Sequence, residues 1–339
     1  MDLIESLARD DKWYLGNGDG IIFAPPFPVW LDAPGFWDDA QIYQYAVGPL
    51  FTVTILDHDG RELPLVTRSR RWTPADLTVE YDLPGGMRAT EIRTVQPGGV
   101  FASEWTVRSP QPVALHAVGW TAQDTATLDV ASVQWDGALQ WVRTVTDRRE
   151  VPLAVRCDLA AVGESTSWSA TLSERSALQP HWRLAPFAEL WEGEALPRRV
   201  RLEGISMAGL LYGAVHTALP RQATEATFAF ALRLTANADE LRGGRRPTPL
   251  ATRIVPPRSA SPTPLSSAAI GAIGAIGGTG AGRPVSTMPL ARASRRRWSG
   301  FFAQVPSFAC SDPYLERYYW YRWYGLWLNS IQPGVGNYR

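Results

Sequence analysis

The sequence predicts a mainly β protein, in which a large antiparallel β-sandwich is followed by a linker and a helical C-terminal segment. From Tyr43 to about Leu234, short runs alternate in polarity and are rich in Val, Thr and aromatic residues. Residues 242–290 change in composition and become rich in Pro, Ser, Ala and Gly. The segment from Tyr314 to Trp327 then carries eight aromatic side chains in 14 positions. These three features predict domains at 1–241 (sandwich), 242–290 (linker), 291–306 (connecting helix) and 307–339 (start of a helical unit).

The strands are expected where β-forming residues alternate with polar ones. The clearest runs are Leu50–Leu56, Leu77–Tyr81, Arg88–Val95 and Ala102–Val107. Turn residues separate them: Asp59-Gly60 and Asp136-Gly137 suit tight hairpins, and Pro84-Gly85-Gly86 and Pro97-Gly98-Gly99 indicate two further reversals. Because no helical pattern intervenes, an antiparallel sandwich is favoured, and about 200 residues exceed a seven-stranded module, so two large sheets are expected.

The linker is predicted from low complexity. Gly at every third position of the repeat at 269–277 opposes both helix and strand, and no aromatic residue offers a core. From Arg242 to Trp298 there are ten arginines and no acidic residue. Such a tract suits a solvated linker, and the alternative is a contact with an anionic partner.

Composition limits the other classes of function. The 339 residues are 45% hydrophobic and include 15 Trp, enough for a sizeable core. Lys12 is the one lysine beside many arginines, and with abundant Ala, Gly and Pro this is typical of a GC-rich bacterial genome rather than of selection for nucleic acid. The longest apolar run is too short to cross a membrane. The first ten residues lack the apolar core of a signal peptide, and Cys157 and Cys310 lack metal-type spacing. We therefore expect a reduced, cytoplasmic protein without a cofactor or a metal site.

Two helices are expected near the C-terminus. Trp298, Phe301 and Phe302 follow helical spacing until Pro306 ends the run. Asp312 can then cap a second helix whose first position suits Pro313. Apolar and aromatic residues lie nearly all round this second helix, so it should be enclosed by other helices. Since little sequence follows it, the chain is expected to be the front part of a larger protein.

Three segments carry a family resemblance. They are GNGDGIIFAPPFPVWLDAPGFWDDA (Gly16–Ala40), RRWTPADLTVEY (Arg70–Tyr81) and RWSGFFAQVPSFACSDPYLERYYWYRWYGLWLN (Arg297–Asn329). Together with their order along the chain, these segments resemble bacterial glycoside hydrolases of the six-hairpin, (α/α)6-barrel superfamily. Within that superfamily, the resemblance is to mannosylglycerate hydrolase-like and glycoside hydrolase family 63-like proteins. The resemblance implies the N-terminal part of an enzyme that acts on α-linked sugars by inversion, with a general acid and a general base. Both carboxyl groups are implied to lie on barrel segments beyond Arg339, so no catalytic residue is assigned in this chain.

A sugar-binding wall is the function expected to remain. Aromatic planes pack on the C–H faces of sugars, while amides and charged groups bind hydroxyls. The candidate substrate-binding residues are Tyr319, Trp320, Arg322, Trp323, Asn329 and Asn337. Helical periodicity places 319, 322, 323 and 326 on one face, whereas 320 and 321 diverge. The alternative is that these aromatic residues form the core between barrel helices.

Other polar groups receive simpler interpretations. Alternation predicts that Glu80, Glu91 and Glu104 face solvent. Asp38 and Asp39 are candidates for a loop that reaches towards an active site. The four histidines are isolated in sequence and indicate neither zinc nor a catalytic pair.

Two rival functions stay open at this point. One is a freestanding sandwich that binds a polysaccharide without hydrolysing it, and the other is a scaffold whose last helix docks onto a separate helical partner.

Overall fold

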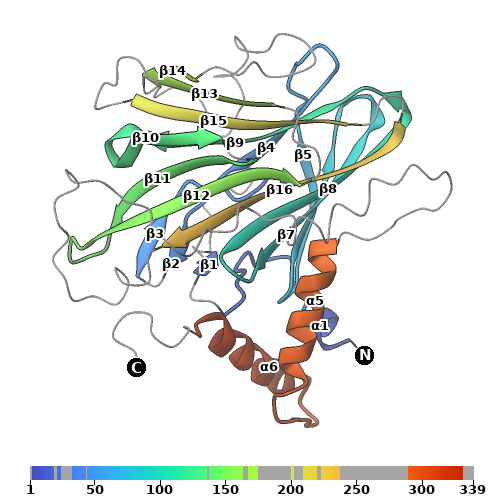
Figure 1. Cartoon of the computed structure of the whole chain (residues 1–339). Coiled ribbons are helices and arrows are strands. Elements are labelled where there is room, and N and C mark those ends of the chain that lie inside the picture. Colours follow the sequence, from blue (N-terminus) through green and yellow to red (C-terminus); the bar gives the residue numbers. More distant parts are fainter. Residues whose placement is uncertain are drawn as a thin grey trace.

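Two β-sheets packed face to face form most of the molecule, and helices lie at one end (Figure 1). This computed structural model describes residues 2–18, 21–23, 33–42, 44–135, 137–162, 167–174, 200–201, 209–219, 223–236 and 289–330. Elements keep the labels of Figure 1. The mainly β class with antiparallel sheets followed by helices is confirmed.

Among the described residues, the larger sheet has eight strands and every neighbouring pair is antiparallel. Its order is β10 (Leu128–Trp135), β11 (Leu139–Thr146), β12 (Pro152–Val162), β16 (Ala223–Ala236), β8 (Val100–Val113), β7 (Arg88–Gln96), β6 (Leu77–Asp82) and β5 (Val66–Trp72). The 3-10 turns η1 (Pro84–Gly86) and η2 (Thr125–Thr127) connect strands.

The second sheet packs against this one. Within the described ranges it has the order β14 (Val200–Arg201), β13 (Ser167–Glu174), β15 (Gly209–Ala218), β9 (His116–Asp124) and β4 (Thr52–Leu56). A small sheet of β1 (Ile21–Phe23), β2 (Ala40–Ile42) and β3 (Tyr45–Val47) completes the set.

The core between the two large sheets is filled by aromatic side chains. Trp105 stacks on Tyr81 and on Phe228 at centroid distances of 5.5 and 5.8 Å. Gly119 of β9 lies under Phe230 of β16, where an added Cβ would sit 2.5 Å from the ring. The glycine therefore lets the sheets approach closely at this point.

The predicted turns form, although one hairpin is short. The reversals at Pro84 and Pro97 and the turn at Gly137 join antiparallel neighbours, as predicted. The turn at Asp59-Gly60 forms a short hairpin, as predicted, in which Asp57 N donates to the Arg61 carbonyl and Leu63 N donates to the Ile55 carbonyl, both at 2.9 Å. Leu56 and Glu62 form a bridge in this hairpin, and beyond it the segments separate, because β5 joins the larger sheet while β4 stays in the other.

The helices are α1 (Leu3–Ser6), α5 (Pro289–Phe302) and α6 (Pro313–Leu328). The Asp312 carboxylate accepts hydrogen bonds from the N–H groups of Tyr314 and Leu315, so the predicted cap is present. No helix in the described part of the chain is long and apolar enough to cross a membrane. The predicted linker, apart from residues 289–290, lies outside the described residues, and the domain boundaries stay predictions.

Candidate functional site

The C-terminal helix α6 carries most of the predicted site residues, so its attachment to the sandwich determines the geometry of the candidate site. The first contact is made by α5, whose N-terminal turn lies on the outer face of the larger sheet. The Glu104 carboxylate of β8 accepts hydrogen bonds from the N–H groups of Leu290 and Ala291, at 3.1 and 2.9 Å. Gln96 Nε2 donates to the Leu290 carbonyl at 3.0 Å. A strand carboxylate thus caps a helix that is distant in sequence.

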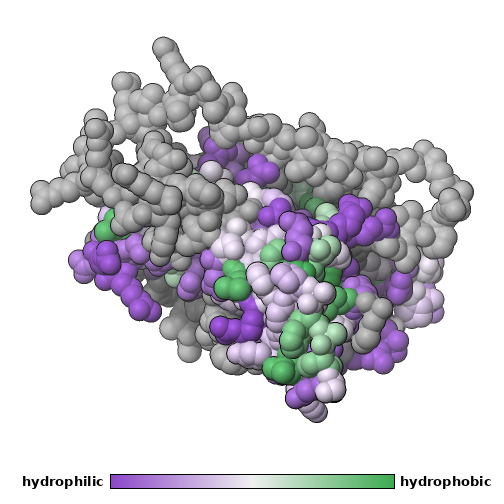
Figure 2. Space-filling view, turned by 90° about the horizontal axis from the view of Figure 1, so that it is seen from below, coloured by the Kyte–Doolittle hydropathy of each residue, from purple (hydrophilic) through white to green (hydrophobic). Residues whose placement is uncertain are grey.

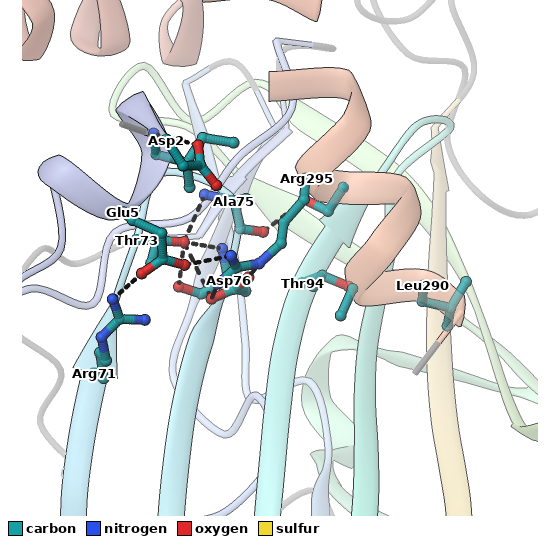
Figure 3. A network of polar contacts seen from close by, with 12 residues as sticks. Asp2, Glu5, Arg71, Thr73, Ala75, Asp76, Thr94, Leu290 and Arg295 are labelled. Atoms are coloured by element: carbon teal, nitrogen blue, oxygen red, sulfur yellow. Dashed lines mark hydrogen bonds and ion pairs between the residues drawn. The ribbon is translucent and has the colours of Figure 1, made fainter. Parts of the chain in front are cut away.

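A polar network fixes the middle of α5 (Figure 3). Arg295 Nε donates to Asp76 Oδ2 at 2.7 Å, and the same guanidinium pairs with Glu5 of α1. Glu5 also pairs with Arg71 of β5, and this hydrogen bond, with that from Arg295, holds the pKa of Glu5 below its ordinary value. Ser294 Oγ donates to the Ala75 carbonyl at 2.6 Å. The network therefore ties α1, the β5–β6 turn and α5 together.

An aromatic cluster joins α5 to α6. Trp298 is 1% exposed, and its ring lies 5.0 Å from Tyr324 and 4.4 Å from Trp327 between centroids. Phe301 stacks on Trp327 at 4.0 Å. Tyr324 also meets Trp72, at the end of β5, edge to face at 5.2 Å. The helix pair therefore packs on the sandwich through buried rings rather than through polar contacts alone.

The N-terminal segment provides carbonyl groups for α6. Arg317 donates to the Ala8 carbonyl at 2.8 Å, and Tyr321 Oη donates to the Leu7 carbonyl at 2.9 Å. Tyr324 Oη donates to the Tyr14 carbonyl, and burial raises the pKa of this phenol well above its ordinary value. These three contacts orient one side of α6 towards residues 7–14.

Three predicted sugar-binding residues lie elsewhere on the helix surface. Tyr319 stacks on Phe308 at 4.8 Å and donates to the Pro306 carbonyl at 2.7 Å. Trp323 meets the Tyr319 ring edge to face at 6.3 Å. Arg322 is exposed, and its guanidinium carbon lies 5.9 Å from the Tyr318 ring centroid. Tyr319 and Trp323 thus contact each other, with Arg322 beside them on the helix.

The other three predicted residues are placed differently. Trp320 meets Phe302 of α5 edge to face at 6.0 Å, so it takes part in helix packing. Asn329 is exposed, and its amide donates to the Gly325 carbonyl one turn earlier at 2.7 Å. Asn337 lies outside the described residues. A role of any of the six in sugar binding stays a prediction.

The rest of the α6 surface is open. Tyr314 is 84% exposed and Leu326 is 60% exposed, and Leu315 and Tyr318 are also exposed. Figure 2 views the molecule from the end where the helices lie and shows apolar residues at its surface. The expected enclosure on most sides is therefore not seen among the described residues, because α6 is covered mainly where it meets α5, Trp72 and the N-terminal segment.

Two of the three glutamates that were predicted to face solvent are buried. Glu80 is exposed as predicted, but Glu91 is 0% exposed and Glu104 is 3% exposed. Glu91 faces the core, where its carboxylate accepts hydrogen bonds from Gly35 N, Ser103 Oγ, Tyr81 Oη and Arg93 at 2.6–2.8 Å. Arg93 also donates to the Ala33 carbonyl at 3.0 Å. This network binds residues 33–35 to β7, which gives the buried charges a positioning role.

Two histidines that are far apart in sequence meet in the structure. His116 Nδ1 and His216 Nε2 are 3.1 Å apart, and both side chains are buried. Burial, with the nearby His116, lowers the pKa of His216 to about 4. Only the antiparallel pairing of β9 and β15 brings these residues together, so sequence spacing could not reveal the pair.

The N-terminal acidic candidates lie beside the small sheet. Asp38 is buried, and the Asp39 carboxylate lies against Gly48, where an added Cβ would overlap its Oδ1. Within the described residues, no group of three or more His, Cys, Asp or Glu side chains could hold a metal ion.

No protein-family model and no curated protein matches the sequence. Solved structures do match. The chain is similar to a structure named for a kojibiose phosphorylase from the human microbiome, with a TM-score of 0.50, 6% identity, and coverage of 96% of this chain and 40% of that chain. It also matches the GH92-family glycosyl hydrolase ccman5, with a TM-score of 0.44, 10% identity, and coverage of 97% of this chain and 41% of that chain.

The chain therefore spans about two fifths of the length of these structures. At 6% identity the first likeness shows a shared fold.

Proposed function

We propose that this chain is the N-terminal, non-catalytic portion of a glycoside hydrolase or glycoside phosphorylase that acts on α-linked sugars. In this proposal the sandwich holds α5 and α6 as the first part of a helical barrel. The general acid and the general base lie on polypeptide outside these 339 residues. The assignment to mannosylglycerate hydrolase-like or family 63-like enzymes, with an inverting mechanism, belongs to the same proposal.

The observation that carries the proposal is the helix α6, which is firmly attached on one side and open on the other. The cluster of Trp298, Tyr324 and Trp327 buries the attached side. Tyr314, Leu315, Tyr318 and Leu326 are exposed on the remaining surface. Exposed apolar residues gathered on one helix are typical of a surface that binds another polypeptide. The shared fold with two fifths of a larger enzyme supports the same interpretation.

The first test measures catalysis by the chain alone. The purified protein is incubated with a panel of α-linked disaccharides, with and without inorganic phosphate, and released glucose and sugar phosphate are quantified. We expect no turnover above the buffer control, because in this proposal the general acid and the general base belong to other polypeptide. Robust turnover would show that the chain is itself an enzyme and would contradict the proposal.

The second test looks for the polypeptide that would complete the helical barrel. The polypeptide encoded by the next reading frame is co-expressed with this chain, and we expect a helical protein that co-purifies and gives turnover. Exchanging Tyr318 and Leu326 for Glu should prevent co-purification, whereas Arg148→Gln, on an exposed turn of the sandwich, should not. If the neighbouring polypeptide is not helical, or if the Glu variant still binds it, the proposed docking through α6 is wrong. Tight binding of a neutral oligosaccharide by this chain alone would instead favour a freestanding binding module.

A further inference from the structure

The outer face of the larger sheet carries an open groove of about 520 Å³. Arg68, Glu80, Arg88, Thr90, Thr106 and Arg108 are among its lining residues. They lie on β5–β8 at the end remote from α5, because α5 is capped by Glu104, four residues before Arg108 on the same strand. Four residues of extended strand span about 13 Å. The groove is therefore separate from the helix surface considered above.

The strand register brings the arginines together. Arg88 of β7 pairs directly with Arg108 of β8, so both side chains project from the same face. Arg68 is the extra residue of a bulge between Thr67 and Ser69 of β5, on the other side of β6. Like charges in a directly opposed pair destabilise a sheet unless other charges compensate. Here Asp82 and Glu225 lie beside the two opposed arginines, so how closely these carboxylates pair with them decides what remains for a ligand.

Each of these arginines has an acidic neighbour, but of the three ion pairs only the one at Arg108 is close enough for a hydrogen bond. Asp82 Oδ1 lies 3.9 Å from Arg88 Nε and 4.0 Å from Arg68 Nη1, which is beyond hydrogen-bonding distance. Arg108 Nε donates to Glu225 Oε2 at 2.8 Å. No hydrogen bond joins the Arg88 guanidinium, which is 68% exposed, to another described residue. Its five N–H donors are open to a ligand or to water.

The floor of the groove offers hydroxyl groups. Thr90 pairs with Thr106 two residues along from the arginine pair, a separation of about 7 Å. Glu80 pairs with Thr90 from the next strand and accepts a hydrogen bond from Ser69 Oγ at 2.9 Å. The Tyr81 ring is only 1% exposed, so it offers no stacking surface. The groove is thus basic at one end and lined by hydroxyl and carboxylate groups further along.

We propose that this groove binds a single sugar unit that carries a carboxylate or phosphate group. The oxyanion lies between Arg88 and Arg108, where guanidinium groups make charge-assisted hydrogen bonds to it. The sugar hydroxyls reach Thr90, Thr106 and Glu80, since the threonine pair lies about 7 Å along the strands from the arginine pair. The proposal does not rest on the proposed function, because no residue of α5 or α6 lines the groove.

Isothermal titration calorimetry with glucuronate, glucose 6-phosphate and glucose tests the proposal on the full chain. We expect the two anionic sugars to bind, glucose not to bind at the same concentration, and added NaCl to weaken binding. A preference for glucuronate or for glucose 6-phosphate identifies the oxyanion. Arg88→Gln should lower the association constant at least about tenfold, because a charge-assisted contact is lost.

The control is Arg148→Gln, an exposed arginine in the β11–β12 turn, which should bind like the natural chain. Thr90→Val removes a hydroxyl group from the floor of the groove. It should weaken the binding of glucuronate and of glucose 6-phosphate about equally. Circular dichroism establishes that each variant is folded. If neither anionic sugar binds, if glucose binds as well as glucuronate, or if Arg88→Gln binds unchanged, the proposal is wrong.

Discussion

The Glu104 carboxylate on β8 accepts a hydrogen bond from the N–H of Ala291 at 2.9 Å, across 187 positions of sequence. Because the adjacent N–H of Leu290 donates to the other carboxylate oxygen, one strand residue satisfies two free donors of the first turn of α5. Burial raises the pKa of Glu104 above its ordinary value, and these two hydrogen bonds oppose that effect. The contact therefore fixes where α5 begins on the sheet.

Glu104→Ala should lower the free energy of unfolding by about 1 kcal/mol, the usual cost of losing a helix N-cap. Urea unfolding measures the loss, and hydrogen exchange should show faster opening of the first turn of α5. The control is Glu80→Ala on the same face of the sheet, which caps no helix and should change stability by less than about 0.5 kcal/mol. Equal effects of the two substitutions would show that the cap contributes nothing specific.

The buried pair of Glu91 and Arg93 gives a second prediction. Glu91→Leu leaves the Arg93 guanidinium buried without its carboxylate, which should cost about 3–5 kcal/mol. Replacing both residues with Leu removes the charge as well, so the double variant should be more stable than the Glu91 single variant. The urea concentrations at the midpoint of unfolding compare the stabilities of the two variants. A double variant that is less stable than the single one would refute this account.

Local chemistry explains why much of the fold was predictable. The reversals at Pro84 and Pro97 depend on turn residues that lie next to each other in sequence. The switch of β5 away from β4 depends on which sheet has space for it, and neighbouring residues do not encode that. The hairpin at Asp59-Gly60 is therefore shorter than the runs on its two sides predicted.

The same limit explains the acidic residues and the histidines. Period-two alternation shows which residues share a face but not which face is covered. Glu91 lies on the inner face, and Glu104 lies on the outer face but under α5. Both were therefore mispredicted, for different reasons. His116 and His216 meet only through pairing of distant strands.

The His116–His216 pair predicts a loss of stability in acid. His216 has its pKa lowered from 6.5 to about 4, so the unfolded chain binds a proton more readily in that window. The stabilising contribution is complete above the ordinary pKa and is lost as pH falls from 6.5 towards 4. Between about pH 7.5 and about pH 5 the loss from this residue should be about 2 kcal/mol.

Urea unfolding at several pH values tests this linkage. His216→Gln cannot take up the proton, so its stability should vary less with pH than that of the natural chain. His58→Gln is the matched control, because the His58 side chain is 72% exposed, and it should keep the natural pH dependence. Parallel pH profiles for all three proteins would rule out the buried pair as the source.

The aromatic cluster predicts the strength of attachment of the helices. Trp298→Ala removes a ring that is 1% exposed and contacts both Tyr324 and Trp327, so it should cost about 3–5 kcal/mol. Arg296 is exposed and lies two residues earlier on α5, so Arg296→Ala should lower the free energy of unfolding by less than about 0.5 kcal/mol. Proteolysis of the Trp298 variant should cut first near α5 and α6, and an intact helical region would contradict the assigned role.

The open surface of α6 predicts a separation between stability and association. Tyr318 and Leu326 are 58% and 60% exposed, so replacing both with Gln should leave the urea midpoint nearly unchanged. The same change removes apolar surface, so it should reduce self-association in sedimentation velocity experiments. Trp320→Gln should behave in the opposite way, because Trp320 packs on Phe302 and its loss uncovers that ring. If the double Gln variant unfolds more easily than the Trp320 variant, Tyr318 and Leu326 support the fold of this chain, and the surface of α6 is not free to bind a helical partner.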